Sequence, residues 1–366
     1  MTSRQKYYFP QLDSIRGLSF LAVFFFHAWH PNFGTGFFGR LIEYVYNNLF
    51  LSIDVFFILS SFLLTWLGIN EYKIKGNFSF INYFIRRVLR IWPLYYLLMI
   101  FSFIVLPYAA SAMQVPVTLP PAGYYLFFVS NFYLEGHVYF LRFLWTLSVE
   151  EQFYLIWGIC LLLFQKQMVL LVLIFIAVSA GYTIYALDQN IFHDFHTLTY
   201  LFDFAVGILA AYLLHKKGKA ARFFENMTMR GSTLFLCILP AIFVMMFIIS
   251  DNSPRSDAPW LDLSLRYLFV VFIGALIMEQ MVNKQTALRL GVQKFLVYTG
   301  KISYGLYCFH GIVLTFGLLA IQKLQLSMPG ILQALLLLLV NFMISAASYR
   351  FIERPFLKLK DKMRRV

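Results

Sequence analysis

Residues 51–65 read LSIDVFFILSSFLLT, an apolar run that is interrupted near its start by one carboxylate, Asp54. The run lies within a longer hydrophobic stretch, 46–68, and a helix needs about 20 apolar residues to cross a bilayer. A charged side chain at the bilayer centre costs roughly 2.5–3.5 kcal/mol on insertion scales. Asp54 is therefore expected to face a polar interior between helices.

The same pattern, an apolar stretch with an ionisable group inside it, recurs along the chain. About ten stretches reach spanning length, and they cover 11–31, 46–68, 80–107, 141–164, 168–187, 197–215, 231–250, 262–282, 301–323 and 329–351. The ionisable residues within them include Arg16, His27, Asp54, Glu150, Glu151, Asp203 and His310. The sequence predicts an all-α, polytopic integral membrane protein in which about ten transmembrane helices surround a buried polar site.

The composition supports this class. The 366 residues are 60% hydrophobic and 13% charged, whereas a soluble domain has about 25% charged residues. Because no polar stretch is long enough to fold separately, residues 1–366 are expected to form a single transmembrane domain. The three cysteines fall inside predicted spans without metal-type spacing, so they are interpreted as packing residues and no metal site is expected.

The net charge of +13 is explained by topology. With ten spans both termini lie on one side, and that side holds 25 of the 30 lysines and arginines, including those at span ends. The other side holds Arg40, Arg142, Arg255, Arg266 and Lys323. The positive-inside rule then places both termini in the cytoplasm, and no nucleic-acid partner is needed to explain the basic residues.

Two segments are expected to depart from simple spanning helices. Within 108–140, the aromatic stretch 122–133 is too short to cross and predicts a re-entrant or interfacial piece on the outer side. In the third stretch, Arg86, Arg87 and Arg90 lie on one side of a helix, and Pro93 predicts a kink or restart. Their spacing alone is compatible with snorkelling at lipid head groups or with an anion clamp.

Arg16 and His27 are eleven residues apart, about 16 Å and nearly in register on one helix face. If Arg16 marks the cytoplasmic edge, His27 lies at or beyond the middle of the membrane. There it could be a satisfied core residue, a proton relay or a general base. Glu150 and Tyr154 share a face at four-residue spacing.

Six segments, taken in order, resemble the motifs of the acyltransferase family 3, membrane proteins that O-acylate cell-surface and secreted carbohydrates. They are LDSIRGLSFLAVFFFH (12–27), LSIDVFFILSSFLLT (51–65), RVLRIWP (87–93), LWTLSVEEQFYLI (144–156), GKISYGLYCFH (300–310) and YRFIERPF (349–356). The resemblance extends over nearly the whole chain. One departure from the family's motifs is Ser61, where the family usually has glycine. Because both residues are small, this departure affects only how closely the helix can pack against its neighbours.

The resemblance implies transfer of an acyl group, most simply acetyl, from cytoplasmic acetyl-CoA or another acyl-CoA to a hydroxyl of a cell-surface or lipid-linked carbohydrate. It implies catalysis by His27, as general base, and Glu150, binding of CoA phosphates by Arg16, Arg87 and Arg90, and acceptor binding by Asp54, Trp145 and His310. Many relatives carry a C-terminal SGNH-type domain, and the chain resembles the stand-alone type. The implied location is a bacterial inner membrane, with membrane lipid as a further partner.

The alternative class is a multi-helix transporter or exporter of a small polar or acylated metabolite. It would also have many helices and buried charges. Transporters tend to show two halves with Gly- or Pro-broken helices at matching positions, and none stands out here. Use of acyl-CoA would separate the two classes, because an enzyme transfers or hydrolyses it.

Overall fold

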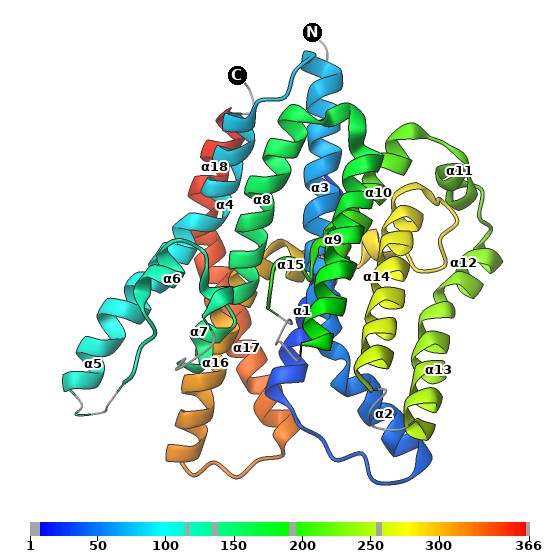
Figure 1. Cartoon of the computed structure of the whole chain (residues 1–366). Helices are drawn as coiled ribbons and strands as arrows, with labels where there is room; N and C mark the ends of the chain where they lie inside the picture. The colour runs from blue at the N-terminus through cyan, green and yellow to red at the C-terminus, as the bar shows by residue number, and fades with distance from the viewer. Residues whose placement is uncertain are drawn as a thin grey trace. The chain divides into compact units, whose positions relative to one another are not determined.

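The computed structural model describes residues 8–112, 114, 117–133, 138–189, 195–253 and 258–363. All regular secondary structure in these ranges is helical, and they contain no strand. The main helices are α1 (Pro10–Ala28), α2 (Phe37–Asn47), α3 (Ser52–Lys75), α4 (Phe80–Ile100), α5 (Leu106–Ala112), α6 (Ala122–Leu126), α7 (Tyr139–Arg142), α8 (Trp145–Leu163), α9 (Met168–Asp188), α10 (Leu201–Lys216), α11 (Lys219–Glu225), α12 (Met229–Leu236), α13 (Ile238–Asn252), α14 (Ala258–Val282), α15 (Lys294–Lys301), α16 (Ser303–Lys323), α17 (Gly330–Ser348) and α18 (Arg354–Met363) (Figure 1).

Eight helical segments of the described chain are long and apolar enough to cross a membrane. They are Phe37–Lys75, Phe80–Ala112, Tyr139–Leu163, Gln165–Asp188, Met229–Asn252, Pro259–Val282, Ser303–Lys323 and Gly330–Leu359. Each coincides with one of the stretches expected from the sequence. The prediction of an all-α, multi-pass membrane protein is therefore confirmed.

The remaining two expected stretches also form helices, but neither is among these eight. Helix α1 has 19 residues, and its first turns carry Gln11, Asp13 and Arg16, which lower its hydropathy. Helix α10 has only 16 residues and carries Asp203 in its first turn. Both helices carry side chains that the sequence singled out as buried ionisable groups.

The contacts of the chain group into two compact units. Unit 1 comprises Met1–Phe26, Pro31–Trp66 and Asp203–Ser303, and unit 2 comprises His27–His30, Leu67–Phe202 and Tyr304–Val366. Unit 1 thus holds all of α2 and α11 to α15, together with most of α1, α3 and α10. Unit 2 holds α4 to α9, α17 and α18, nearly all of α16, and the ends of α1 and α3.

In unit 1, α14 packs against α11 and α13, and α13 packs against α2 (Figure 1). The approach of α3 to α10 depends on Gly207. A Cβ atom at this position would lie 2.0 Å from Ser61 Oγ and 2.3 Å from the Ile58 carbonyl oxygen. The glycine that permits close packing here is thus on α10, and Ser61 is accommodated against it on α3.

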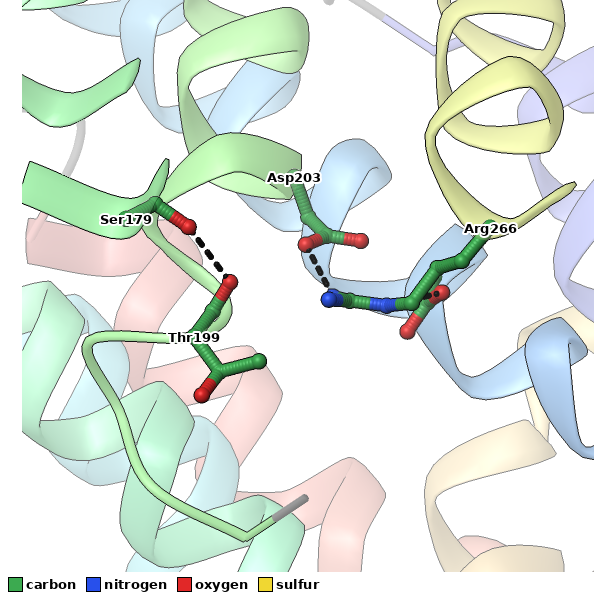
Figure 2. Close-up of polar contacts among 5 residues, drawn as sticks. Ser179, Thr199, Asp203 and Arg266 are labelled. Atoms are coloured by element: carbon green, nitrogen blue, oxygen red, sulfur yellow. Dashed lines mark hydrogen bonds and ion pairs between the residues drawn. The ribbon is translucent and has the colours of Figure 1, made fainter. Parts of the chain in front are cut away.

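In unit 2, α4 packs against α8 and α18 (Figure 1). Tyr95 of α4 is buried and donates a hydrogen bond of 2.7 Å to the carbonyl oxygen of Tyr125. Ser179 of α9 donates a 2.7 Å hydrogen bond to the Thr199 carbonyl oxygen and so holds the turn before α10 (Figure 2).

Two local expectations have clear outcomes. Helix α4 continues through Pro93, so no restart occurs there, and the irregular turn comes later, at Phe101–Val105. The aromatic stretch 122–133 does not span: it forms the five-residue helix α6 and a short 3-10 turn at Ser130–Phe132. Within the segment 108–140, residues 113, 115, 116 and 134–137 lie outside the described residues.

Candidate active site

In unit 2, three rings from distant parts of the sequence meet at the end of α1. The His27 ring centroid lies 4.7 Å from that of Phe143 and 5.9 Å from that of His310. Phe143 also contacts His310, at 4.4 Å between centroids. The structure therefore brings the predicted base together with a second imidazole, and the aromatic ring that contacts both limits how they can move.

His310 is fully buried in α16. Its Nδ1 atom forms a hydrogen bond with the carbonyl oxygen of Tyr307, and a carbonyl can only accept, so the neutral imidazole carries its proton on Nδ1. The other nitrogen, Nε2, has no hydrogen-bond partner among the described residues. A buried acceptor without a partner costs free energy, which makes this atom a candidate for binding a substrate hydroxyl.

Tyr307 and Gly311 hold His310 and Phe143 together. The Tyr307 hydroxyl donates to the Phe143 carbonyl oxygen at 3.0 Å and pairs with Thr146 Oγ1 at 2.9 Å. A Cβ atom at Gly311 would lie 2.6 Å from Phe143 Cδ2 and 2.9 Å from Phe140 Cα. Only glycine allows α16 to approach this closely.

Glu150 joins a polar chain in α8 that leads to one of the predicted donor-binding arginines. Tyr154 donates a 2.8 Å hydrogen bond to Glu150 Oε2, which confirms that these residues share a face. The Arg87 guanidinium carbon lies 5.5 Å from the centre of the Tyr154 ring, a cation–π arrangement. Glu150 and Arg87 are thus connected through Tyr154.

The three arginines of α4 have different surroundings. Arg86 forms a 2.8 Å ion pair with Glu71, whereas Arg87 faces Tyr154. Arg90 lies within electrostatic reach of Glu353, a buried carboxylate next to α18. Arg86 is therefore engaged by the protein, and Arg87 and Arg90 remain the better candidates for an anionic ligand.

Glu151, the neighbour of Glu150, is buried and accepts a hydrogen bond of 3.3 Å from Trp92 Nε1. Its other oxygen, Oε1, has no partner among the described residues. Trp92 lies between Arg90 and Pro93 in the sequence, so this bond ties the arginine segment of α4 to α8.

Two other predicted site residues have structural partners of their own. Arg16, in unit 1, forms a 3.1 Å ion pair with Asp13 one turn earlier in α1. Trp145, in unit 2, is buried, and its ring lies 4.6 Å from Phe195 and 5.4 Å from Tyr200 between centroids. Their predicted roles in binding donor and acceptor remain predictions.

Asp54 lies in an ion triad of unit 1. Arg266 of α14 donates from Nη2 to Asp203 Oδ2 at 2.5 Å (Figure 2). It also donates from Nε to Asp54 Oδ2 at 3.0 Å. The side chains are 5%, 0% and 12% exposed for Asp54, Asp203 and Arg266. The triad confirms that Asp54 is buried, and it connects α3, α10 and α14.

The charge balance of this triad predicts unequal effects of substitution. Arg266→Gln would leave two carboxylates buried without their cation and should lower the free energy of unfolding by about 3–5 kcal/mol. Asp203→Asn is the matched control, since one carboxylate would still face one guanidinium, and its loss should be far smaller. Thermal unfolding of the purified variants in detergent measures both. Equal losses would show that charge balance does not control the stability of the triad.

The charge count along the sequence places Arg266 on the outer side, at the end of a span, whereas the structure places it inside α14 as the partner of two carboxylates. The signal was available, because a cation within the apolar segment LSLRYLFVV requires a buried partner. Phe143 and Thr146 were also missed, because packing residues carry no chemical signature of their own.

The described residues contain no group of three or more His, Cys, Asp or Glu side chains that could hold a metal ion. Unit 2 holds the pair of imidazoles, His27 and His310, and the chain formed by Glu150, Tyr154 and Arg87. Such a set suits proton transfer and binding of an anionic donor.

The fold and these groups define a class: a multi-pass membrane protein with buried acid–base and cationic side chains. Residues 9–350 match the family model described as the acyltransferase domain. The chain therefore belongs to the acyltransferase family 3, as its motifs indicated.

Similar proteins include known and putative O-acetyltransferases. The chain is 27% identical to the peptidoglycan O-acetyltransferase OatA of Listeria monocytogenes over 98% of its own length and 57% of that protein. It is 27% identical to a putative O-acetyltransferase of Staphylococcus aureus strain COL over 96% of its length and 58% of the relative. A putative peptidoglycan O-acetyltransferase of Bacillus subtilis, YrhL, is 32% identical over 41% of the chain and 23% of the relative.

The chain thus spans somewhat more than half the length of the first two of these relatives. No solved structure matches it.

Proposed function

We propose that this membrane acyltransferase transfers an acetyl group from acetyl-CoA to a hydroxyl of a cell-surface glycan, with peptidoglycan as the first candidate acceptor. The observation that carries the proposal is the pairing of His27 with His310 beside Phe143. The names of the relatives support acetyl as the group and a wall glycan as the acceptor.

The proposed step is a direct acyl transfer. His27 takes the proton of the acceptor hydroxyl as its oxygen attacks the acetyl carbonyl carbon, a C–O bond forms, and the C–S bond of the thioester breaks. The CoA thiolate leaves and takes up the proton that His27 received. A histidine suits this work because it can both accept and return a proton near neutral pH.

His310 has a separate role in this proposal. With its proton held on Nδ1 by the Tyr307 carbonyl, its buried Nε2 can only accept a hydrogen bond. It would orient the acceptor hydroxyl, or a neighbouring hydroxyl of the same sugar, next to His27. Glu150 of α8, which accepts a hydrogen bond from Tyr154, is proposed to assist the proton transfer by His27.

Arg87 and Arg90 are proposed to bind the phosphates of CoA. Guanidinium groups form paired, charge-assisted hydrogen bonds to phosphate, and these two lie one helical turn apart on α4. Arg16 is proposed as a third cation for the same donor, although it is already paired with Asp13.

A cytoplasmic donor requires the topology that we propose, with both termini in the cytoplasm of a bacterial inner membrane. Since Arg266 is buried in an ion triad, the outer side retains even fewer basic residues than the sequence count gave it. Residue Arg255 lies outside the described residues. Reporter fusions after residues 220 and 366 should be cytoplasmic, and one near residue 255 should be external. An external C-terminus would contradict the topology.

The experiment that tests the function is a comparison of wall glycans from cells that produce the chain and cells that lack it. Mass spectrometry should find sugar O-acetyl groups that depend on the chain. A transporter would leave the O-acetyl content unchanged when acetyl-CoA and acceptor are both present, so unchanged acetylation would favour that class.

A further inference from the structure

A basic groove lies in unit 1, and its lining residues come from α11, α12 and the start of α13. Figure 1 shows where these three helices follow one another. The groove has a cavity volume of about 1020 Å³, and its lining combines Lys219, Arg222 and Phe223 of α11 with Leu234 and Ile238 of the α12–α13 segment. Thr228 caps α12 by accepting a hydrogen bond from the Gly231 amide. This bond fixes the turn before α12, which also lines the groove. Nothing in the proposed acetyl transfer uses this groove.

The cationic part of the basic groove has no protein counter-ion. Lys219 and Arg222 are exposed, and neither side chain forms a hydrogen bond or ion pair with any described residue. No carboxylate lines the cavity. Between residues 215 and 238 the sequence has five lysines and arginines and one acid, Glu225. The groove is therefore complementary to an anion.

The remaining wall is apolar and exposed. Phe223 of α11 is 63% exposed, and Leu234 of α12 is 72% exposed. The segment Met229–Asn252 is long enough to span a membrane. Only 17% of its most apolar 18-residue stretch is buried inside the protein. Lipid must cover most of this helix, so acyl chains are next to the cations of the groove.

We propose that the basic groove binds one anionic glycerophospholipid, with its phosphate at Lys219 and Arg222 and an acyl chain along Phe223, Leu234 and Ile238. Basic pockets beside transmembrane helices suit such head groups. The combination of a phosphate-binding end and an apolar wall fits a lipid better than a free phosphate, which would use only the cations.

Acetyl-CoA, the proposed donor, is also an anion, but it fits this groove less well than a phospholipid does. It carries phosphates and no long apolar chain, so the exposed wall formed by Phe223 and Leu234 would stay uncovered. A competition experiment between phosphatidylglycerol and coenzyme A distinguishes these two occupants.

The test measures binding of fluorescent phosphatidylglycerol, with fluorescent phosphatidylcholine as the neutral lipid, to the purified full chain in detergent by anisotropy. Lys219→Gln with Arg222→Gln should lower the affinity for phosphatidylglycerol roughly twenty-five-fold, because each basic side chain contributes about a factor of five. The matched control, Lys216→Gln with Lys217→Gln, removes the same charge from the end of α10, just before α11 and outside the groove, and should change the affinity less than about threefold. Phe223→Ala should weaken lipid binding without changing the charge.

Three results would overturn the proposal. The two double variants could lose equal affinity, which would indicate general surface charge. Inorganic phosphate could displace the lipid completely while Phe223→Ala has no effect, which would indicate a phosphate site. Coenzyme A could displace phosphatidylglycerol at stoichiometric concentration, which would indicate a nucleotide site. Preferential binding that resists both competitors and requires Lys219, Arg222 and Phe223 supports it.

Discussion

Replacement of His27 by glutamine is expected to lower acetyl transfer by about 10²–10⁴-fold, the contribution of a positioned general base. Glutamine keeps similar bulk and can still form hydrogen bonds beside Phe143, but it cannot take up a proton near neutral pH. Expression and acetyl-CoA binding should stay near normal. The rate of CoA release from acetyl-CoA in the presence of acceptor measures the loss.

His30 provides the control for this variant. It lies three residues after His27 and is exposed, so His30→Gln should stay active. A His27→Gln protein with normal activity would show that His27 is structural, and the search for the base would move to His310. His310→Gln should weaken use of the acceptor, since its Nε2 is the proposed acceptor-binding atom.

The second large effect concerns the donor. Arg87→Ala combined with Arg90→Ala is expected to weaken acetyl-CoA binding by roughly a hundredfold, because a hydrogen bond to a charged group is worth about 1.5–3 kcal/mol. Lysine at both positions should restore part of the affinity, since an ammonium group keeps the charge but lacks the paired geometry of guanidinium. Equilibrium binding of labelled acetyl-CoA measures each variant.

The control for general charge loss is Arg354→Ala with Lys358→Ala. Both residues are exposed on α18, which packs against α4, and the substitution removes the same charge. Its affinity for acetyl-CoA should stay close to that of the unmodified chain. If Arg87→Ala with Arg90→Ala binds the donor as tightly, the arginines of α4 only anchor the helix at the membrane surface.

Much of the fold was predictable because a membrane restricts the chain to few solutions. A stretch of about 20 apolar residues must form a helix in lipid, so the positions of the spans follow from hydropathy. Local irregularities were harder. Pro93 stays inside α4, and the π-helical turn appears at Phe101–Val105, because the packing of neighbouring helices decides where the backbone deviates.

The candidate site was predictable in its residue types and less so in its partners. His27 and His310 were singled out because ionisable groups in apolar helices need a reason to be there. Their proximity across Phe143, and the pairing of Asp54 with an arginine 212 positions away, are tertiary contacts that no local pattern encodes. The sequence groups Arg86 with Arg87 and Arg90, but in the structure Arg86 forms an ion pair with Glu71, a tertiary contact that the sequence does not reveal.

In the proposed reaction, the imidazole pair of unit 2 transfers an acetyl group from acetyl-CoA to a glycan hydroxyl. The most direct measurement is the release of CoA from acetyl-CoA by the purified chain in lipid vesicles, with and without a soluble wall-glycan fragment, for the unmodified chain, His27→Gln and His310→Gln. The glycan should stimulate CoA release and acquire the acetyl group. Both variants should bind acetyl-CoA, but His27→Gln should release CoA at the background rate, and His310→Gln should need more glycan to reach the same rate. Glycan-independent CoA release by the unmodified chain, or equal acetyl transfer by all three proteins, would contradict the proposed reaction.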